Sequence, residues 1–175
     1  TNRHLELIQP FDNREIDVWI GTQMSAKGLD FDHVGLVGIL DADLMLNKTD
    51  FRAFERAFQL MTQVAGRSGR RNKRGKVIIQ TGNPDHWVIQ KVMQHDYDAF
   101  ALNEIVERRN YHYPPFYKLV RFTLKHRDRD LVDAGALHFS KLLKEQFHER
   151  VLGPESPVIA RIQNFYLKEI VLKIE

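Results

Sequence analysis

The sequence of 175 residues contains no cysteine. A disulfide framework and a thiolate zinc site are therefore excluded within these residues, and the absence favours an intracellular protein. No run approaches the roughly 18 consecutive apolar residues of a membrane-spanning helix, so we expect no membrane contact. The eight histidines include no H-x-H or H-x₃-H pair, and the sequence accordingly predicts no metal site.

A strong excess of charge of one sign is also lacking. The 26 Lys and Arg residues against 23 Asp and Glu leave a net charge of +3, too small for a global argument about nucleic acid. The local distribution says more, because the segment from Arg67 to Lys76 carries six basic residues and no acid. The chain starts without methionine and stops inside an apparent strand at 169–175, so we expect it to be part of a longer protein.

Hydrophobic periodicity predicts alternating strands and helices up to about residue 110. Short, nearly continuous apolar runs are typical of strands buried on both faces of a parallel sheet, whereas spacings of three and four predict helices. The expected strands are 17–20, 33–40 and 76–81, and the expected helices are 4–13, 50–65 and 85–109. Thr49 or Asp50 is the expected N-cap of the central helix. This order indicates an α/β fold with a partial parallel sheet and flanking helices.

Adjacent prolines in the segment YHYPPF, residues 111–116, interrupt this periodicity and place a domain boundary after residue 110. Beyond it we expect a small α+β domain over 111–175, cut short at its end. The order strand, helix, strand, strand indicates a split βαβ arrangement. The expected elements are strands 118–125, 158–162 and 170–174, a helix at 130–150 and a turn at Gly153-Pro154.

Two segments carry the chemistry of phosphate binding. Residues 63–70 read QVAGRSGR, which places Arg67 and Arg70 where a helix runs into a glycine-broken loop. Guanidinium binds phosphate oxygens bidentately, and small neighbours let a nucleotide approach the backbone. Upstream, residues 18–31 read VWIGTQMSAKGLDF, an apolar strand ending in a polar loop, and α/β sheets bind ligands at such edges. A solvated basic helix end is the alternative for the arginine pair.

Asp41 and Asp43 form a D-x-D pair at the end of a predicted strand. In isolation such a pair could hold Mg²⁺. The sequence continues into Leu44-Met45-Leu46, which favours the other interpretation, that one carboxylate caps or braces the loop.

The two segments resemble motifs V and VI of superfamily 2 helicases, which lie in the second RecA-like lobe. The linking sequence, LDADL at 40–44 and DFRAFERAFQL at 50–60, resembles the PriA family of primosomal replication-restart helicases, as do YPPF at 113–116 and the segment from Gly153 to Arg161. The resemblance covers nearly the whole chain. It implies that 1–110 is the distal part of helicase lobe 2 and that 111–175 is a C-terminal domain.

Site residues follow from this resemblance. The implied catalytic groups are Arg70 and Arg67, which would reach the γ-phosphate of ATP; which of the two does so stays open. The implied nucleotide side consists of Gly28, Asp30 and Gln63, together with the two arginines. The implied DNA side consists of Thr22, Gln23 and Lys27.

Two further basic groups are open to two interpretations. Arg71, Lys73 and Arg74 would either contact DNA or solvate a loop. Arg161 and Lys168 stand among Asn164, Phe165 and Tyr166 near a predicted hairpin. That mixture fits a surface on which single-stranded bases stack, and aromatic packing in a strand core explains it nearly as well.

The activity implied by the resemblance is ATP- and Mg²⁺-dependent 3′-to-5′ unwinding of branched or stalled replication forks, followed by primosome assembly in the bacterial cytoplasm. Implied partners are forked and single-stranded DNA, single-stranded-DNA-binding protein and other primosome proteins. Family members carry a zinc-binding insertion that has no counterpart in this cysteine-free sequence. No G-x-x-x-x-G-K-[ST] or D-E-x-H segment occurs, so we expect these residues alone to be inactive. The alternatives are a non-catalytic nucleic-acid-binding module and another superfamily 2 helicase or translocase.

Overall fold

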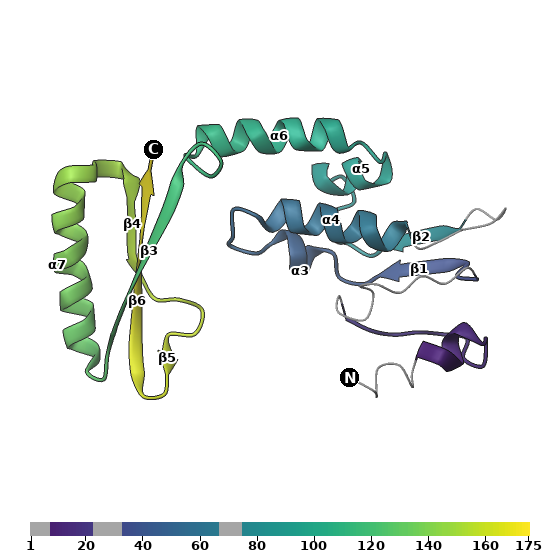
Figure 1. Cartoon of the computed structure of the whole chain (residues 1–175), viewed down its shortest axis with the longest axis horizontal. Helices are drawn as coiled ribbons and strands as arrows, with labels where there is room; N and C mark the ends of the chain where they lie inside the picture. The colour runs from purple at the N-terminus through teal and green to yellow at the C-terminus, as the bar shows by residue number, and fades with distance from the viewer. Residues whose placement is uncertain (1–7, 23–32, 67–74) are drawn as a thin grey trace. The chain divides into compact units, whose positions relative to one another are not determined.

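The computed structural model describes residues 8–22, 33–66 and 75–175 (Figure 1). The chain divides into two compact units, Thr1–Ala101 and Leu102–Glu175, called unit 1 and unit 2 below. Both are mixtures of helices and small sheets. No helix of the described ranges is long and apolar enough to cross a membrane.

Unit 1 contains the parallel sheet that the sequence predicts. Strand β1 (Leu36–Ile39) pairs with β2 (Lys76–Ile79) in parallel, with Leu36 opposite Lys76. Between the two strands the chain forms the short helix α3 (Asp43–Leu46) and the longer helix α4 (Ala53–Ala65). Because parallel neighbours need a crossover, α4 returns the chain to the start of the sheet.

The core of unit 1 lies between this sheet and the helices. Helix α4 buries Phe58 and Met61, as its spacing predicts, and α5 (Trp87–Met93) contributes Ile89. The Phe58 ring stacks on Phe100 at a centroid distance of 4.1 Å. The apolar stripe of α4 is therefore core packing, and it fixes the direction in which the C-terminal end of the helix points.

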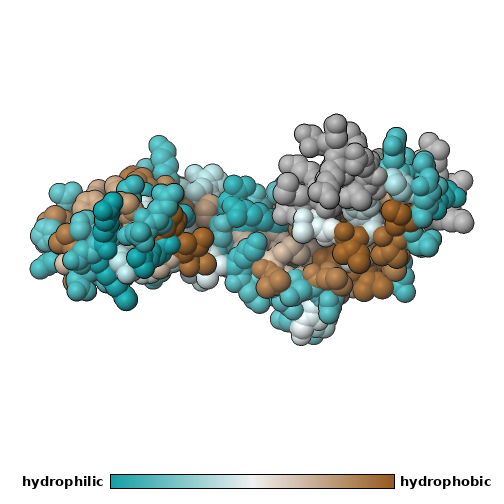
Figure 2. Space-filling model, turned by 90° about the horizontal axis from the view of Figure 1, so that it is seen from below, coloured by the Kyte–Doolittle hydropathy of each residue, from teal (hydrophilic) through white to brown (hydrophobic). Residues whose placement is uncertain are grey.

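The predicted strand at 17–20 is wrong. Its residues lie in irregular backbone, and Val18 and Ile20 are 68% and 87% exposed. Leu36 in β1 is also 56% exposed, so the prediction of strands buried on both faces fails there too. Within the described residues this sheet has only two strands, and Figure 2 shows apolar side chains gathered on one face of unit 1.

Helix boundaries in unit 1 differ from the predicted ones in two further places. Helix α4 begins at Ala53, and neither Thr49 nor Asp50 is its N-cap, because residues 50–52 first form a turn in which Arg52 N–H donates to Asp50 Oδ1 (2.9 Å). The predicted helix 85–109 is two helices, α5 and α6 (Tyr97–Asn110). His95 has a φ of 54°, which ends α5, and Asp96 then accepts a hydrogen bond from Ala99 N–H. Of the predicted helix 4–13, residues 8–12 are helical and 4–7 lie outside the described residues.

Unit 2 is a small α+β domain with the split βαβ arrangement that the sequence predicts. Its strands are β3 (Lys118–His126), β4 (Val151–Glu155), β5 (Arg161–Ile162) and β6 (Phe165–Ile174), and its helices are α7 (Arg129–Phe147) and the 3₁₀ helix η1 (His148–Arg150). The sheet order is β3-β6-β4, with β6 antiparallel to both neighbours. Strands β3 and β4 therefore run in the same direction, joined by α7 and separated by β6.

Helix α7 covers one face of this sheet (Figure 1), and the core of unit 2 forms there around Val151, Ile170 and Leu172. The predicted turn at Gly153-Pro154 is wrong, because both residues lie inside β4. A register shift between Leu152 and Glu155 accommodates them in the ladder, as bulges commonly do for glycine and proline. The strand predicted at 158–162 shrinks to the two residues of β5.

Lys173 anchors the proline-containing segment to the sheet of unit 2. Its side chain is nearly buried, its Nζ donates to the carbonyl oxygen of Tyr111 (2.6 Å), and it lies 4.0 Å from the centre of the Tyr113 ring. Burial lowers the pKa of this ammonium group from its ordinary value of 10.5.

Candidate functional site

Helix α4 carries the chain to the predicted phosphate-binding arginines. It ends at Ala65 with Gly66 as C-cap, and Gln63 is exposed in its last turn. Of the site residues predicted within the two motifs, the structure describes only Gln63 and Thr22, and both are exposed. The following predicted site residues lie outside the described residues: Gln23, Lys27, Gly28, Asp30, Arg67, Arg70, Arg71, Lys73 and Arg74.

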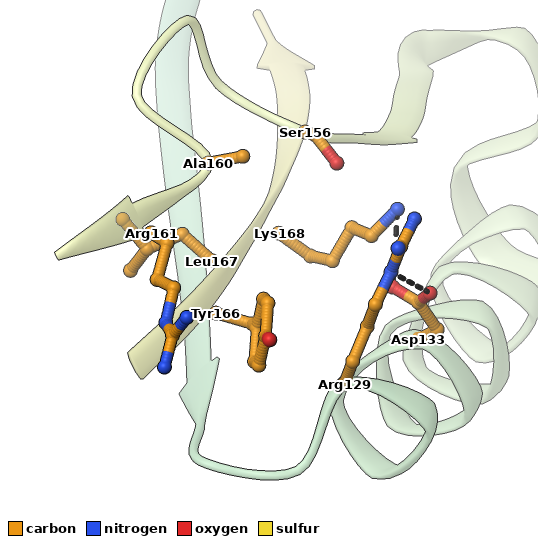
Figure 3. Close-up of a pocket in the computed structure, with 8 residues that line it drawn as sticks. All are labelled: Arg129, Asp133, Ser156, Ala160, Arg161, Tyr166, Leu167 and Lys168. Atoms are coloured by element: carbon orange, nitrogen blue, oxygen red, sulfur yellow. Dashed lines mark ion pairs between the residues drawn. The ribbon is translucent and has the colours of Figure 1, made fainter. Parts of the chain in front are cut away.

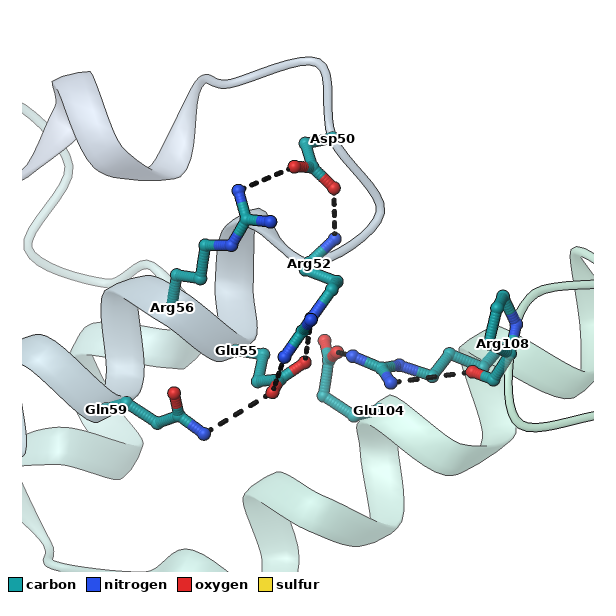
Figure 4. A network of polar contacts seen from close by, with 8 residues as sticks. Asp50, Arg52, Glu55, Arg56, Gln59, Glu104 and Arg108 are labelled. Atoms are coloured by element: carbon teal, nitrogen blue, oxygen red, sulfur yellow. Dashed lines mark hydrogen bonds and ion pairs between the residues drawn. The ribbon is translucent and has the colours of Figure 1, made fainter. Parts of the chain in front are cut away.

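The start of α4 is held by a network of charged side chains (Figure 4). Arg56 pairs with Asp50 at 2.7 Å, and Arg52 pairs with Glu55 at 2.9 Å. Gln59 Nε2 donates to Glu55 Oε1 (3.4 Å). These partly exposed pairs each contribute little to stability, but they fix the turn from which the helix starts.

The second carboxylate of the aspartate pair links the segment after β1 to the segment after β2. Asp43 accepts hydrogen bonds from Thr81 Oγ1 and from Gly82 N–H, both at 2.7 Å. Asp41 Oδ1 accepts from Leu44 N–H (3.3 Å). The hydrogen bond from Gly82, followed by that from Thr81, holds the pKa of Asp43 below its ordinary value of 3.8. The bracing interpretation is thus confirmed for both carboxylates.

The other predicted residues, Arg161 and Lys168, lie together in unit 2. They line a cavity of about 190 Å³ between α7 and the β5–β6 hairpin (Figure 3). Lys168 Nζ lies 3.1 Å from Asp133 Oδ1, and Arg129 Nε lies 3.8 Å from Asp133 Oδ2. The remaining lining residues are Ser156, Ala160, Tyr166 and Leu167. Three cations therefore line the cavity with a single carboxylate, which pairs with Arg129 and Lys168 but not with Arg161, and the excess of positive charge suits an anion.

Cations also lie against the two aromatic rings of the hairpin. Arg161 is 5.0 Å from the centre of the Tyr166 ring and donates to Asn164 Oδ1 (3.0 Å). The Phe165 ring has Lys125 at 5.6 Å and Arg127 at 5.4 Å. Because neighbouring residues of a strand point to opposite faces, these two groups lie on opposite sides of the hairpin.

Sequence reasoning missed Lys125, Arg127, Arg129 and Asp133 as members of this site. They precede the hairpin by about 30–40 residues, and only the pairing of β3 with β6 and the packing of α7 bring them close. A usable signal was present, because a split βαβ arrangement predicts that the turn after β3 and the start of β6 meet at one end of the sheet.

The fold and these side chains define a class: an α/β protein with a small α+β domain that exposes a cationic hairpin. Residues 109–175 match the family model described as the primosomal protein N C-terminal domain. The chain is 43% identical over 172 residues to the replication restart protein PriA of Bacillus subtilis, and 40% identical over 174 residues to that of Synechocystis. Each match covers 97% of this chain and 21% of the relative.

A third relative, the replication restart protein PriA of Treponema pallidum, is 40% identical over 170 residues, which is 96% of this chain and 26% of the relative. The chain belongs to the PriA family of replication restart proteins and matches its C-terminal region. It spans about a fifth to a quarter of the length of the relatives it matches.

Proposed function

We propose that this chain acts within an ATP-dependent DNA helicase that recognises stalled or branched replication forks and restarts replication by primosome assembly. The observation that carries the proposal is the match to replication restart proteins over 97% of the chain, which includes both predicted motifs. The parallel pair β1–β2 with α4 between the strands supports a place for unit 1 in a RecA-like lobe.

In this proposal unit 1 supplies the arginine side of an ATP site. Helix α4 leads directly into Arg67 and Arg70, and the exposed Gln63 stands in its last turn. Phosphoryl transfer develops charge that a fixed guanidinium stabilises. The groups that grip ATP and Mg²⁺ would come from elsewhere in a longer protein, because this sequence has no Walker loop. The zinc of the family would also be bound elsewhere.

The proposal is tested on a protein of the relatives' full length that carries this sequence. Arg70→Ala should lower fork-stimulated ATP hydrolysis by about 10³-fold or more, since arginine fingers have effects of that size. Fork binding, measured by fluorescence anisotropy, should stay within about threefold, because the residue is assigned to nucleotide rather than DNA. Residues 1–175 alone should release no phosphate from ATP.

Arg56→Ala is the matched control, since Arg56 lies on the same helix and is half-exposed but pairs with Asp50. Hydrolysis should persist in this variant. Parallel loss of binding and hydrolysis in Arg70→Ala, or phosphate release by residues 1–175 alone, would contradict the assignment.

Unit 2 is proposed to contact the DNA backbone through its hairpin. Phosphates suit the cavity of Arg129, Arg161 and Lys168, whose single carboxylate leaves an excess of positive charge. Single-stranded-DNA-binding protein and other primosome proteins, acting in the bacterial cytoplasm, would be the protein partners. The same contact between the hairpin and DNA is expected if the chain is instead a non-catalytic nucleic-acid-binding module. The two functions differ because such a module would bind DNA without any role for a nucleotide.

Arg161→Ala should weaken binding to forked DNA. It should also make the negative slope of the logarithm of the binding constant against log[salt] shallower by about 0.9, the value for one lost phosphate contact. Lys168→Ala should change the slope less, because its ammonium group is already paired with Asp133. Binding titrations at several salt concentrations measure both slopes. Equal slopes for wild type and Arg161→Ala would show that Arg161 does not contact a DNA phosphate.

A further inference from the structure

An exposed aliphatic tip projects from the loop that joins β4 to β5. Val158 is 100% exposed and its neighbour Ile159 is 64% exposed. The base of the loop is anchored, because Leu167 N–H donates to the carbonyl oxygen of Ala160 (2.9 Å). Ser156 and Ala160, at the two ends of the loop, both line the cationic cavity (Figure 3). Val158 and Ile159, called the apolar tip below, therefore stand beside the cationic cavity.

The aromatic rings of the hairpin are less available than the apolar tip. Arg161 lies against Tyr166, while Lys125 and Arg127 lie against Phe165. A nucleotide base would have to displace these cations before it could stack on either ring. The apolar surface that is open to a ligand is aliphatic, and it consists of the apolar tip together with the half-exposed Ile162.

The surrounding charge identifies the partner. Five cations surround the base of the hairpin on its two sides, and the carboxylate of Asp133 is shared by two of them. Asp128 is engaged as the N-cap of α7, where it accepts from Asp130 and Leu131 N–H. The cations are Lys125, Arg127, Arg129, Arg161 and Lys168. An aliphatic wedge flanked by phosphate-binding side chains is the arrangement with which proteins part stacked base pairs.

We propose that the apolar tip inserts between bases where duplex DNA opens, while the cations of the hairpin hold the flanking phosphates. This rests on the proposed function, because it assumes that unit 2 binds DNA. It goes beyond that function in giving unit 2 a part in opening the duplex. Aliphatic side chains replace the stacking that the parted bases lose, and the cations keep the backbone in place.

The test uses residues 1–175 and a forked DNA with 2-aminopurine at the junction, whose fluorescence rises on unstacking. The double variant Val158→Ser, Ile159→Ser should reduce the fluorescence rise at saturating protein about fivefold or more, since parting a base step depends on the inserted side chains. Its fork affinity, by anisotropy, should stay within about threefold because all five cations remain. Val158→Leu, Ile159→Leu should preserve the rise.

Leu137→Ser is the matched control, because Leu137 is 65% exposed on α7 of the same unit. It should behave as wild type. An undiminished fluorescence rise in the serine double variant overturns the wedge and leaves DNA binding by unit 2 standing. Failure of wild type to bind the fork overturns the DNA contact and the wedge together. A benzophenone side chain placed at position 158 should crosslink to DNA, and a crosslink only to a primosome protein would assign the apolar tip to a protein partner instead.

Discussion

Replacing Gly153 by alanine tests the irregular strand β4. Gly153 has a φ of +96°, a conformation that L side chains rarely adopt, and a Cβ there would lie 2.7 Å from the carbonyl oxygen of Glu169 and 3.2 Å from the nitrogen of Glu155. Both neighbours are backbone atoms, so neither can rotate away. Backbone strain of about 1–3 kcal/mol and overpacking of about 1–3 kcal/mol together predict that Gly153→Ala lowers the free energy of unfolding of unit 2 by about 2–6 kcal/mol.

Replacing Gly135 by alanine should change the stability of unit 2 in the opposite direction. Gly135 is exposed in the middle of α7, and a Cβ there would meet no heavy atom within 4 Å. Alanine in a helix interior is more favourable than glycine by about 0.5–1 kcal/mol, so Gly135→Ala should stabilise unit 2 by that amount. The pair thus compares one added methyl group in two backbone settings of the same unit.

The assay must report on unit 2 alone. Both tryptophans, Trp19 and Trp87, belong to unit 1, so denaturation followed by tryptophan fluorescence measures unit 1. Amide hydrogen exchange of β6 measures unit 2 in the same chain, because its most protected amides report global opening. A change below about 1 kcal/mol for Gly153→Ala, or the same sign for both variants, would refute the reasoning from φ and contact distance.

Two further predictions concern charged groups. The pKa of Asp43 is held below 3.8 by Gly82 and Thr81, so its stabilising effect is complete above pH 3.8 and lost as the pH falls through the lower folded value. Asp43→Ala should therefore destabilise unit 1 at pH 7 and match wild type in strong acid, by urea denaturation with tryptophan fluorescence; a difference that persists unchanged in acid would contradict this. For Lys173, a folded pKa below 10.5 means that the folded chain loses its proton first, so the stability of unit 2 should rise as the pH approaches 10.5. Lys173→Met should remove that rise in stability, as measured by hydrogen exchange of the β6 amides. An equal rise in the wild type and in Lys173→Met would count against the burial argument.

The fold of both units was predictable where a single period dominates a segment. Helix α4 is an example, because Phe58 and Met61 continue one stripe that has only one buried face. The split βαβ arrangement of unit 2 followed similarly from the order of strand and helix patterns. In each case local pattern and tertiary packing favour the same element.

Prediction failed where a short segment depends on long-range pairing. Residues 17–20 have the composition of a buried strand, but a strand forms only if another strand pairs with it, and the described residues provide none. Gly153 and Pro154 have turn composition, yet the ladder with β6 and a hydrogen bond from Ser140 Oγ to the Gly153 carbonyl oxygen hold them in β4. Composition alone cannot reveal such partners.

The same distinction separates the two candidate sites. The arginine motif stays a prediction from local chemistry, because Arg67 and Arg70 stand three positions apart in the sequence, next to the glycines that phosphate binding favours. The hairpin site is assembled from distant segments, and this changes the meaning of its predicted members. Lys168, paired with Asp133, helps to position that carboxylate beside Arg129, whereas the exposed Arg161 is free of any carboxylate among its described contacts. Arg161 is therefore the stronger candidate for direct phosphate contact, and the proposed insertion of the adjoining apolar tip depends on a contact of this kind to hold the DNA backbone.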